Sequence, residues 1–569
     1  MHARASYACE LVTTRFFRDL RVTVASETTG TRRAIGGVMR STSIVGAFVS
    51  LVLLACGGGS PGPSASDDPP VGSSPGSESP EGPAPSAPSR IGIASPDAVV
   101  VRAGQSATFE IVAARPADTS GPMTIEILDL PPGVVAHVTA AAKDTWNVEL
   151  ETTAESPLGD HHLRVRASAG DVRGEALAPI VIAGAPGTLD TSFAGSGIGL
   201  AHKNDFGHAV TTDRQGRALV AGLRHGAEEV HAKLTRFLPN GAVDMSFGQD
   251  GALSDIFADA WMSIAYTTAL LDDGAILVSG GIITASNEQK SCFVKLDATG
   301  KRVPSFGVAG QVCAPASMSM PIRQLVVGAD GNMFAAGTTT DADPDMSVLK
   351  VTKDGVLDTS FGAGGRVTFT SPGDQETVGI AFDSKGRLVV GGNCSVDKMA
   401  CAWRLDTNGK VDMTFADGLA KGLVGMIGMD ARAMALGPKD EVYLAGATLT
   451  SQMAVVAFDA DGSSLSTFGS GGWISFALTP KDALFTAAWD DGKLLLAGAG
   501  QDAEAADGAE SQVLALRVGA DGQLDASYAK FGFVLHPVTG EANAVSLSPG
   551  RATFLANRKD GMQLTRVWR

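Results

Sequence analysis

Residues 356–367 read VLDTSFGAGGRV, and versions of this stretch recur through residues 187–569. A catalytic loop is normally needed once, whereas this motif occurs seven times and two copies lack its aspartate. The motif therefore predicts a structural connector, in which Asp358 accepts hydrogen bonds from its own turn and Phe361 packs between neighbouring sheets. The copies are TLDTSF (188–193), AVDMSF (242–247), KRVPSF (301–306), VLDTSF (356–361), KVDMTF (410–415), SSLSTF (463–468) and QLDASY (523–528).

Each copy ends in an aromatic anchor, and the anchors lie 53–60 residues apart. Each anchor is followed by four short runs with strand character. A four-stranded sheet with two apolar faces must pack against copies of itself, and a ring of copies protects the sheet edges. We therefore predict an all-β fold with a seven-bladed propeller of four-stranded blades over residues 187–569; an open solenoid is the alternative. The predicted repeat-core anchors are Phe193, Phe247, Phe306, Phe361, Phe415, Phe468 and Tyr528.

The repeats resemble the delta-60 repeat family in unit length, in the D-x-x-F core and in their D-G turns. The resemblance covers residues 187–569. It implies a propeller-like fold and implies no general activity.

A second repeated feature is a glycine at the end of the third run of each unit. It is Gly222, Gly280, Gly337, Gly392, Gly446 and Gly498, with Asn557 in the last unit. Glycine and asparagine reach left-handed backbone conformations most easily, so we expect a positive φ here. We also expect the aromatic motif to join the fourth strand of one blade to the first strand of the next.

The N-terminal part of the chain carries an export pattern. Residues 39–55 have a basic start, a short apolar run and a small residue before Cys56, which is typical of a signal peptide. LLAC followed by GGGS resembles a bacterial lipobox, which implies a lipid on Cys56. The preceding segment, 1–38, fits no targeting pattern and is predicted to be a mis-called or disordered extension. Gly57 after the cysteine favours the outer membrane by resemblance to enterobacterial sorting.

Two further segments lie between the lipid anchor and the repeats. Residues 56–90 are dominated by Gly, Ser and Pro and are predicted to be a flexible linker. Residues 91–184 alternate apolar and polar residues between frequent turn signals, which predicts a β-sandwich. Their layout, with LPPGV in the middle, resembles the bacterial Ig-like spacer modules of exported proteins.

Four cysteines remain in the predicted exported domains, and an even number in an oxidising compartment favours disulfides. Cys394 and Cys401 flank a hairpin loop, and Cys292 and Cys313 form the second candidate pair. A metal site is the alternative, although no C-x-x-C motif is present.

Other metal candidates are weak. His225 and His231 flank a loop, but their spacing matches no common zinc signature. Three carboxylates lie close together at Asp341, Asp343 and Asp345. The EF-hand pattern needs a glycine and a glutamate at later positions that this loop lacks. A solvated charged loop is the alternative, and we predict no cofactor.

The loops divide into two groups that we expect on opposite faces of the propeller. One group is repetitive and made of tight turns. The other is irregular, and function tends to lie on loops that a rigid scaffold can vary. We predict the irregular face as the ligand face, with Trp261, Met262, Met318 and Met320 as adaptable apolar contacts.

The net charge of −16 argues against a nucleic-acid partner. The chain has no H-E-x-x-H motif and no Walker loop, so an enzyme is the weaker hypothesis. We predict a monomeric, lipid-anchored protein of the cell envelope, facing the periplasm or the cell surface, that binds a protein or polysaccharide without catalysis. The alternatives are a hydrolase or lyase with a site in the propeller channel and a purely structural envelope component.

Overall fold

The computed structural model describes residues 90–569, apart from 118, 204, 227–229, 371–372, 395–398, 419, 423–427, 481 and 506–508. Apart from two single 3-10 turns, η1 (Ala316–Met318) and η2 (Ala416–Gly418), the regular structure of these residues is all β. None of their helices is long and apolar enough to cross a membrane. The predicted signal peptide, Cys56 and residues 57–89 lie outside the described residues.

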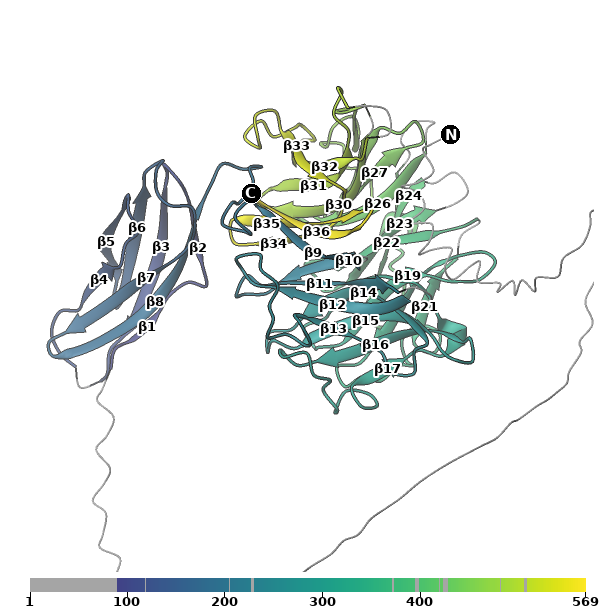
Figure 1. Cartoon of the computed structure of the whole chain (residues 1–569), viewed down its shortest axis with the longest axis horizontal. Coiled ribbons are helices and arrows are strands. Elements are labelled where there is room, and N and C mark those ends of the chain that lie inside the picture. The colour runs from purple at the N-terminus through teal and green to yellow at the C-terminus, as the bar shows by residue number, and fades with distance from the viewer. Residues whose placement is uncertain are drawn as a thin grey trace, which may run out of the picture. The chain divides into compact units, whose positions relative to one another are not determined.

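Residues 92–183 form a sandwich of two four-stranded sheets (Figure 1). One sheet has the order β1-β3-β6-β5 and the other β2-β8-β7-β4, and both contribute to one apolar core that includes Ile111, Val148 and Leu163. Alternating burial, as in Thr145–Thr152, gives each strand one apolar face. The strands are β1 (Gly92–Ala94), β2 (Val99–Arg102), β3 (Ser106–Ala114), β4 (Thr124–Leu128), β5 (Val134–Ala142), β6 (Thr145–Thr152), β7 (Gly159–Ala169) and β8 (Val172–Ala183).

Residues 198–568 form seven further four-stranded sheets, which we number 1 to 7 in chain order. Sheet 1 contains β10 (Asp205–Thr212), β11 (Ala218–His225), β12 (Val230–Phe237) and β13 (Ala252–Ser254). Sheet 2 contains β14 (Met262–Leu270), β15 (Ile276–Ile283), β16 (Gln289–Leu296) and β17 (Gln311–Cys313). Sheet 3 contains β18 (Ile322–Val327), β19 (Met333–Thr338), β20 (Met346–Val351) and β21 (Arg366–Phe369).

The remaining four sheets follow the same plan. Sheet 4 contains β22 (Glu376–Phe382), β23 (Leu388–Cys394), β24 (Met399–Leu405) and β25 (Ala420–Gly422). Sheet 5 contains β26 (Met429–Leu436), β27 (Val442–Thr448), β28 (Met453–Phe458) and β29 (Trp473–Phe476). Sheet 6 contains β30 (Ala483–Asp490), β31 (Lys493–Gly500), β32 (Gln512–Gly519) and β33 (Phe533–Thr539). Sheet 7 contains β34 (Glu541–Ser548), β35 (Arg551–Arg558), β36 (Gly561–Trp568) and β9 (Ile198–Lys203).

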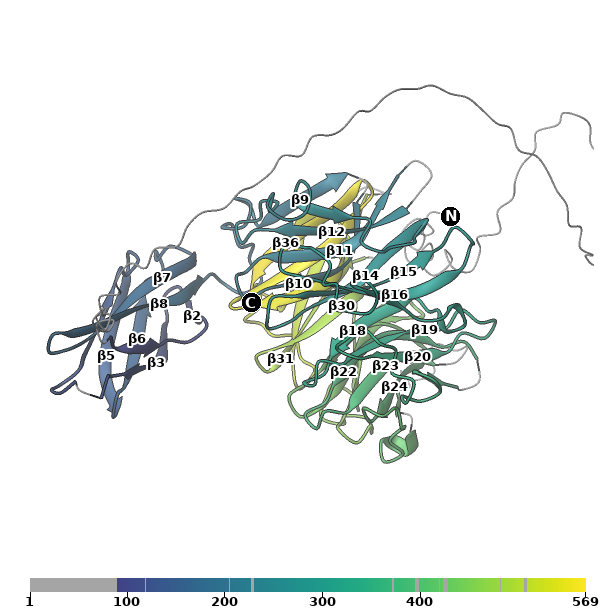
Figure 2. The same cartoon turned by 90° about the horizontal axis from the view of Figure 1, so that it is seen from below.

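The first strands of the seven sheets, which we call the inner strands, contact one another in a closed cycle from β10 through β14, β18, β22, β26 and β30 to β34 and back to β10. Sheet 7 joins the two ends of this β-propeller, because β9 pairs antiparallel with β36 (Figure 2). A strand from the start of the repeats thus completes the last sheet as its fourth strand.

This closure corrects the strand assignment made from the sequence. The run RVTF after the motif is β21, the outermost strand of sheet 3, and the next sheet begins only at β22. The motif therefore joins the third and fourth strands within one sheet, and not two neighbouring sheets. The repetitive turns and the irregular loops still lie at opposite ends of the strands, because the correction renumbers every strand of a sheet by one position.

The aromatic anchors lie between neighbouring sheets, as the sequence predicts. All seven are 0–2% exposed. Phe361 lies between β20 and β21 of sheet 3 and shares a core with Phe334 of that sheet and Ile380 of sheet 4. Each anchor therefore seals a junction between two sheets by burying a large apolar ring.

The motif aspartate organises the turn that leads to the anchor. One carboxylate oxygen of Asp358 accepts hydrogen bonds from the backbone N–H of Ser360, at 3.1 Å, and from its hydroxyl, at 2.5 Å. The other oxygen lies 2.9 Å from the Lys350 ammonium. Lys350 lies over the Phe361 ring, 5.9 Å from its centroid. One basic side chain thus binds the turn and covers the anchor.

Four other copies have the same arrangement with arginine. The guanidinium–carboxylate pairs are Arg236–Asp244, Arg404–Asp412, Arg517–Asp525 and Arg566–Asp190, at 2.7–2.9 Å. The SSLSTF copy has Leu465 at the aspartate position and Ala457 at the position of the basic residue. That copy therefore lacks both the carboxylate and the basic side chain, which avoids a buried cation without a partner.

The motif also binds the next sheet through its backbone. In six of the seven copies the residue after the anchor donates its N–H to a carbonyl in the turn of the next repeat, as Ala416 does to Asp461 at 2.9 Å. Arg236 reaches the carbonyl of Ala298 in the next sheet, at 2.6 Å. The sheets are therefore joined by hydrogen bonds as well as by apolar contact.

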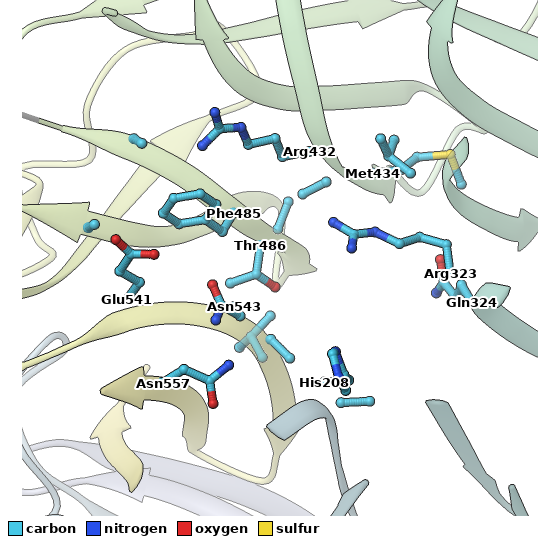
Figure 3. Close-up of a pocket in the computed structure, with 18 of the residues that line it drawn as sticks. His208, Arg323, Gln324, Arg432, Met434, Phe485, Thr486, Glu541, Asn543 and Asn557 are labelled. Carbon is cyan, nitrogen blue, oxygen red and sulfur yellow. The ribbon is translucent and has the colours of Figure 1, made fainter. Parts of the chain in front are cut away.

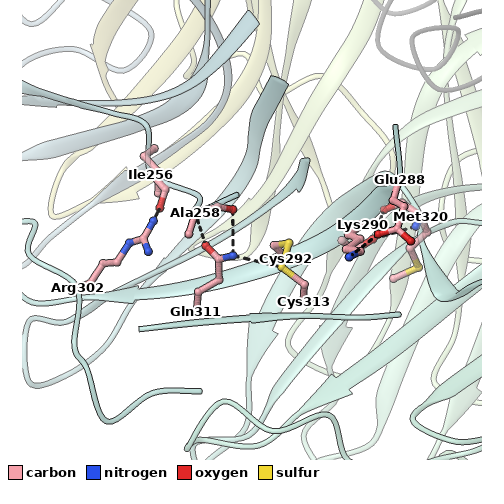
Figure 4. Close-up of a disulfide and its surroundings, with 10 residues drawn as sticks. Ile256, Ala258, Glu288, Lys290, Cys292, Arg302, Gln311, Cys313 and Met320 are labelled. Carbon is pink, nitrogen blue, oxygen red and sulfur yellow. Dashed lines mark hydrogen bonds and ion pairs between the residues drawn. A yellow bond between two sulfur atoms is a disulfide. The ribbon is translucent and has the colours of Figure 1, made fainter. Parts of the chain in front are cut away.

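The two predicted disulfides are confirmed. Cys292 and Cys313 face each other on β16 and β17, with their Cα atoms 4.0 Å apart (Figure 4). Cys394 and Cys401 join β23 and β24 with a Cα separation of 5.9 Å. The first bond fixes a three-residue outer strand to its sheet, where few hydrogen bonds do so.

We expect Phe361→Ala to lower the free energy of unfolding by about 3–5 kcal/mol, because the substitution leaves a cavity between sheets 3 and 4. The measurement is chemical denaturation of the purified protein. Phe531→Ala is the matched control, since Phe531 is 71% exposed. Equal stability of the two variants would contradict the buried position of Phe361.

The turn aspartates predict a pH dependence. Hydrogen bonds from Thr414, assisted by Arg404, lower the pKa of Asp412 from 3.8 to about 2. A depressed carboxyl pKa contributes stability that is complete above about pH 4 and is lost as the pH falls towards 2. Asp412→Asn should therefore cost about 2 kcal/mol at pH 7, and the difference from the native chain should shrink towards pH 2.

Denaturation curves at a series of pH values check this prediction. Asp272→Asn is the control, because the Asp272 side chain is 95% exposed. A difference between native and Asp412→Asn that stays constant from pH 7 to pH 2 would contradict the proposed role of the carboxylate.

Candidate functional site

A cavity of about 820 Å³ lies among the inner strands (Figure 3). All seven inner strands contribute to its lining. The volume is in the range of small-molecule sites in proteins. The cavity therefore occupies the channel of the propeller, where residues from every sheet meet.

Each inner strand has one register shift, a β-bulge, at an equivalent place. The extra residue of each bulge lines the cavity. Bulges redirect a side chain and are frequent at barrel rims and active sites. These residues, which we call the bulge ring, are His208, Tyr266, Arg323, Val378, Arg432, Phe485 and Asn543.

The bulges explain why six of the seven sheets have a glycine at the same place on the second strand. None of the six has a positive φ, so the predicted left-handed backbone is wrong. Each lies on the second strand beside the bulge, where a Cβ atom would meet a carbonyl oxygen of the inner strand at 1.8–2.2 Å. At Gly446 that oxygen belongs to Asp430, at 1.9 Å. The bulge brings the backbone so close that only glycine fits.

Sheet 7 departs from this rule. Ala556, and not Asn557, lies opposite the residue before the bulge. The Asn557 side chain instead accepts the N–H of Gly207 at 2.9 Å and donates to its carbonyl at 2.8 Å. Asn393 binds the backbone of Ala431 in the same way, at 2.8 and 2.9 Å. These two amides fix the inner strand of the next sheet just before its bulge.

One side of the cavity carries a fixed cation. The guanidinium of Arg432 lies 3.2 Å from a carboxylate oxygen of Asp430. It also lies over the ring of Phe485 in the neighbouring sheet, 4.8 Å from the centroid. Both contacts hold the arginine in place at the cavity wall.

Another part of the wall is aromatic. His208 and Tyr266, from sheets 1 and 2, meet edge to face with ring centroids 5.7 Å apart. The Tyr266 hydroxyl is buried and has no hydrogen-bond partner among the described residues. Burial raises the pKa of Tyr266 well above its usual range, so the phenol stays neutral.

The remaining polar lining is mixed in charge. Arg323 is exposed, and Figure 3 shows its guanidinium directed into the cavity. Glu541 and Asn543 line the wall on sheet 7. Asp482 also lines it, but one of its oxygens accepts the backbone N–H groups of Leu478 and Thr479, at 2.8 and 2.9 Å. The cavity thus offers hydrogen-bond donors and acceptors together with aromatic surface.

The residues predicted for the ligand face lie in different environments. Met262 and Met320 are 6% and 1% exposed and belong to the core of sheets 2 and 3, and Met318 packs against that core. Only Trp261 is exposed, at 45%. The methionines therefore attach the irregular loops to the sheets, because their apolar side chains fill the space between sheets 2 and 3.

The predicted metal candidates also lie apart from any cluster. Among the residues that the structure describes, no group of three His, Cys, Asp or Glu side chains could hold a metal ion. His225 meets the ring of Phe206 edge to face, and Asp345 accepts a hydrogen bond from Gln375 at 2.9 Å. His231 lies 3.2 Å from Asp255. Asp341 and Asp343 are exposed.

The bulge ring is not predicted by the sequence pattern. Its one signal is the small-residue-plus-glycine ending of the second strand, which predicts a positive φ and not a bulge. The seven bulge residues are of six different types, so no repeated letter marks them. Aligning each repeated glycine opposite the strand that precedes it in the sequence would locate the bulge residues.

Comparison with known proteins supports the fold. Residues 328–361 match the family model described as "Domain of unknown function (DUF5122) beta-propeller". This match supports a propeller-repeat family for that segment. A search of curated proteins finds no match.

Similar solved structures include a PQQ-bound aldose sugar dehydrogenase from Streptomyces coelicolor, with 14% identity over 53% of this chain and 98% of that chain and a TM-score of 0.32. An arabinanase from Bacillus subtilis has 13% identity over 42% and 91%, with a TM-score of 0.27. A DUF4623 family protein from Bacteroides eggerthii has 9% identity over 77% and 87%, with a TM-score of 0.31. Similarity this low carries no argument about function.

Gly446→Ala tests the origin of the bulge ring. The added Cβ would lie 1.9 Å from the Asp430 carbonyl oxygen, so we expect a loss of about 1–3 kcal/mol in unfolding free energy. Gly92→Ala is the control, because its nearest neighbour would be 3.9 Å away. Thermal and chemical denaturation measure both variants. A fully stable Gly446→Ala would contradict the close approach.

Proposed function

We propose that the protein is a non-catalytic binding protein of the cell envelope that holds part of a saccharide chain in its channel. In this proposal the seven sheets are the blades of a seven-bladed propeller of delta-60 type, and residues 91–184 are an Ig-like spacer. The observation that carries it is the bulge ring, in which one backbone feature is repeated seven times and carries six different residue types. A repeated scaffold with a variable inner position suits selective binding.

The cavity favours a saccharide over a folded protein. Its volume of about 820 Å³ admits a small ligand or a chain end. Its lining offers guanidinium, amide and carboxylate groups that can bind hydroxyls. Of the four apolar residues predicted to contact a protein partner, only Trp261 is exposed, because Met262 and Met320 are buried and Met318 packs against the core.

Catalysis in the channel is the second candidate. Hydrolysis of a glycosidic bond normally needs two carboxyl groups placed on either side of it. Asp430, Asp482 and Glu541 line the cavity. Asp430 is paired with Arg432, and Asp482 accepts backbone hydrogen bonds, so both carboxylates already stabilise the local structure. These three carboxylates therefore agree better with binding than with catalysis. A purely structural role would give no function to the bulge ring.

The proposed location is the outer membrane, with the chain anchored as a monomer through a lipid on Cys56 and held away from the bilayer by the linker. The two disulfides support an oxidising compartment. Metabolic labelling with a radioactive fatty acid tests the anchor. Label should enter the native chain and be absent from Cys56→Ala.

A polysaccharide array probed with the purified full-length chain in detergent tests the binding function. Asn543→Trp should abolish binding, because the larger side chain fills the channel. Ala526→Trp is the matched control, since Ala526 is exposed in a motif position that varies among the copies. Thermal unfolding verifies that both variants are folded.

Saccharide binding that survives in Asn543→Trp would place the site outside the channel and contradict the proposal. Hydrolysis of a bound polysaccharide by the native chain would also contradict the proposal. Capture of an envelope protein with no saccharide bound would contradict it as well.

A further inference from the structure

We infer that the channel binds an uncharged sugar unit, so that its ligand is a neutral saccharide and not an acidic or an amino sugar. This inference rests on the proposed function and names its ligand class. The evidence is that the charged side chains of the cavity wall are already paired, whereas two neutral polar side chains of the wall are not.

The aspartate, glutamate and arginine side chains that line the cavity all have partners. Arg432 is paired with Asp430 at 3.2 Å, and one oxygen of Asp482 accepts two backbone N–H groups. Neither Arg323 nor Glu541 is without a partner. These groups can still form a hydrogen bond to a hydroxyl, but they are not left to balance the charge of a ligand. A charged sugar would therefore lose its hydration in the channel without gaining an ion pair.

The overall charge of the wall also favours neither sign. Among the described lining residues are three carboxylates and two guanidinium groups. The whole chain, with a net charge of −16, repels an anion. A cation would meet carboxylates that are already bound. The electrostatics of the cavity therefore agree best with an uncharged ligand.

Two neutral polar side chains of the wall remain open to a ligand. Thr486 on β30 is 7% exposed, and Asn543 at the bulge of β34 is half-buried. Both line the cavity (Figure 3), and neither has a hydrogen-bond partner among the described residues. Buried polar groups normally have a partner, which can be water or a ligand. Since β30 and β34 contact each other, the two groups belong to one part of the wall.

These two groups suit neighbouring hydroxyls of a sugar ring. The amide of Asn543 has two donor hydrogens and an acceptor oxygen, and the hydroxyl of Thr486 both donates and accepts. A sugar hydroxyl also does both, so the hydrogen bonds form without a charge on either side. A carboxylate could use only the donors, and an ammonium group only the acceptors. The pair therefore favours a neutral polyol.

The apolar part of the wall suits the C–H faces of the same ring. Val378, Met434 and Phe485 line the cavity on sheets 4, 5 and 6. Ligand sites are typically apolar surfaces with a few placed polar groups. A neutral sugar ring has hydroxyls at its edge and C–H groups on its faces, so it matches both parts of the wall.

Calorimetry with the purified full-length chain in detergent tests the inference. The probes are short oligomers of glucose, galactose and mannose, the matching uronate oligomers and the matching amino-sugar oligomers. At least one neutral oligomer should bind, and its charged counterparts should bind about tenfold more weakly or worse. The affinity for the neutral oligomer should be the same at about 0.05 M and about 0.5 M salt, because no ion pair forms.

Asn543→Ala and Thr486→Val should each weaken binding of the neutral oligomer by about fivefold to tenfold, because each removes hydrogen bonds to the ligand. Valine keeps the shape of threonine, so its effect reports the hydroxyl. Asn147→Ala is the matched control and should leave the affinity unchanged, since Asn147 is an exposed strand residue of the sandwich. Thermal unfolding verifies the fold of each variant.

The failures are distinguishable. A charged counterpart that binds as tightly as the neutral oligomer, an affinity that falls with salt, or an unchanged affinity in both Asn543→Ala and Thr486→Val would overturn the neutral-sugar inference. If Asn543→Trp still abolished that binding, the proposed function would stand. No binding of any saccharide would overturn both.

Discussion

The contact between each aromatic anchor and the next sheet is the interaction on which the rest of the structure depends. The anchor buries a ring between two sheets. In five of the seven copies its turn carries an aspartate that binds the turn with one carboxylate oxygen and a basic side chain with the other. The same basic side chain covers the ring. One short motif thus fixes the angle between neighbouring sheets, and seven copies bring the last sheet back to the first.

The inner strands line the channel of the propeller. Their sheets are joined by the anchors and by the pairing of β9 with β36. Each inner strand has a bulge, and the residue at the bulge lines the cavity. The repeated glycine accepts the backbone shift, and the bulge residue itself is left to vary. The residues that join the sheets and the residues that line the channel are therefore different positions of the same repeat.

Several features could be predicted from the sequence because they repeat or come in pairs. The buried anchors, the aspartate turn and both disulfides are of this kind. The order of the strands could not be assigned, because β9 pairs with a strand from the other end of the repeats, and no local pattern marks that pairing. The strand after the motif therefore seemed to open a new sheet, although it completes the previous one.

The candidate site was harder to predict for a different reason. A glycine can signal either a positive φ or a backbone that approaches too closely for a Cβ atom, and the letter is the same in both cases. Only the register between strands distinguishes them. Met262 and Met320 were ambiguous in a similar way, since a methionine near a loop can face solvent or fill the core beneath it.

The account's central claim is that selective binding takes place at the bulge ring. The most direct measurement is a crystal structure of the protein grown with a saccharide that binds to it. The expected result is density for one sugar unit in the channel, in contact with residues of the bulge ring. Density on the irregular loops beside Trp261, with an empty channel, would contradict it.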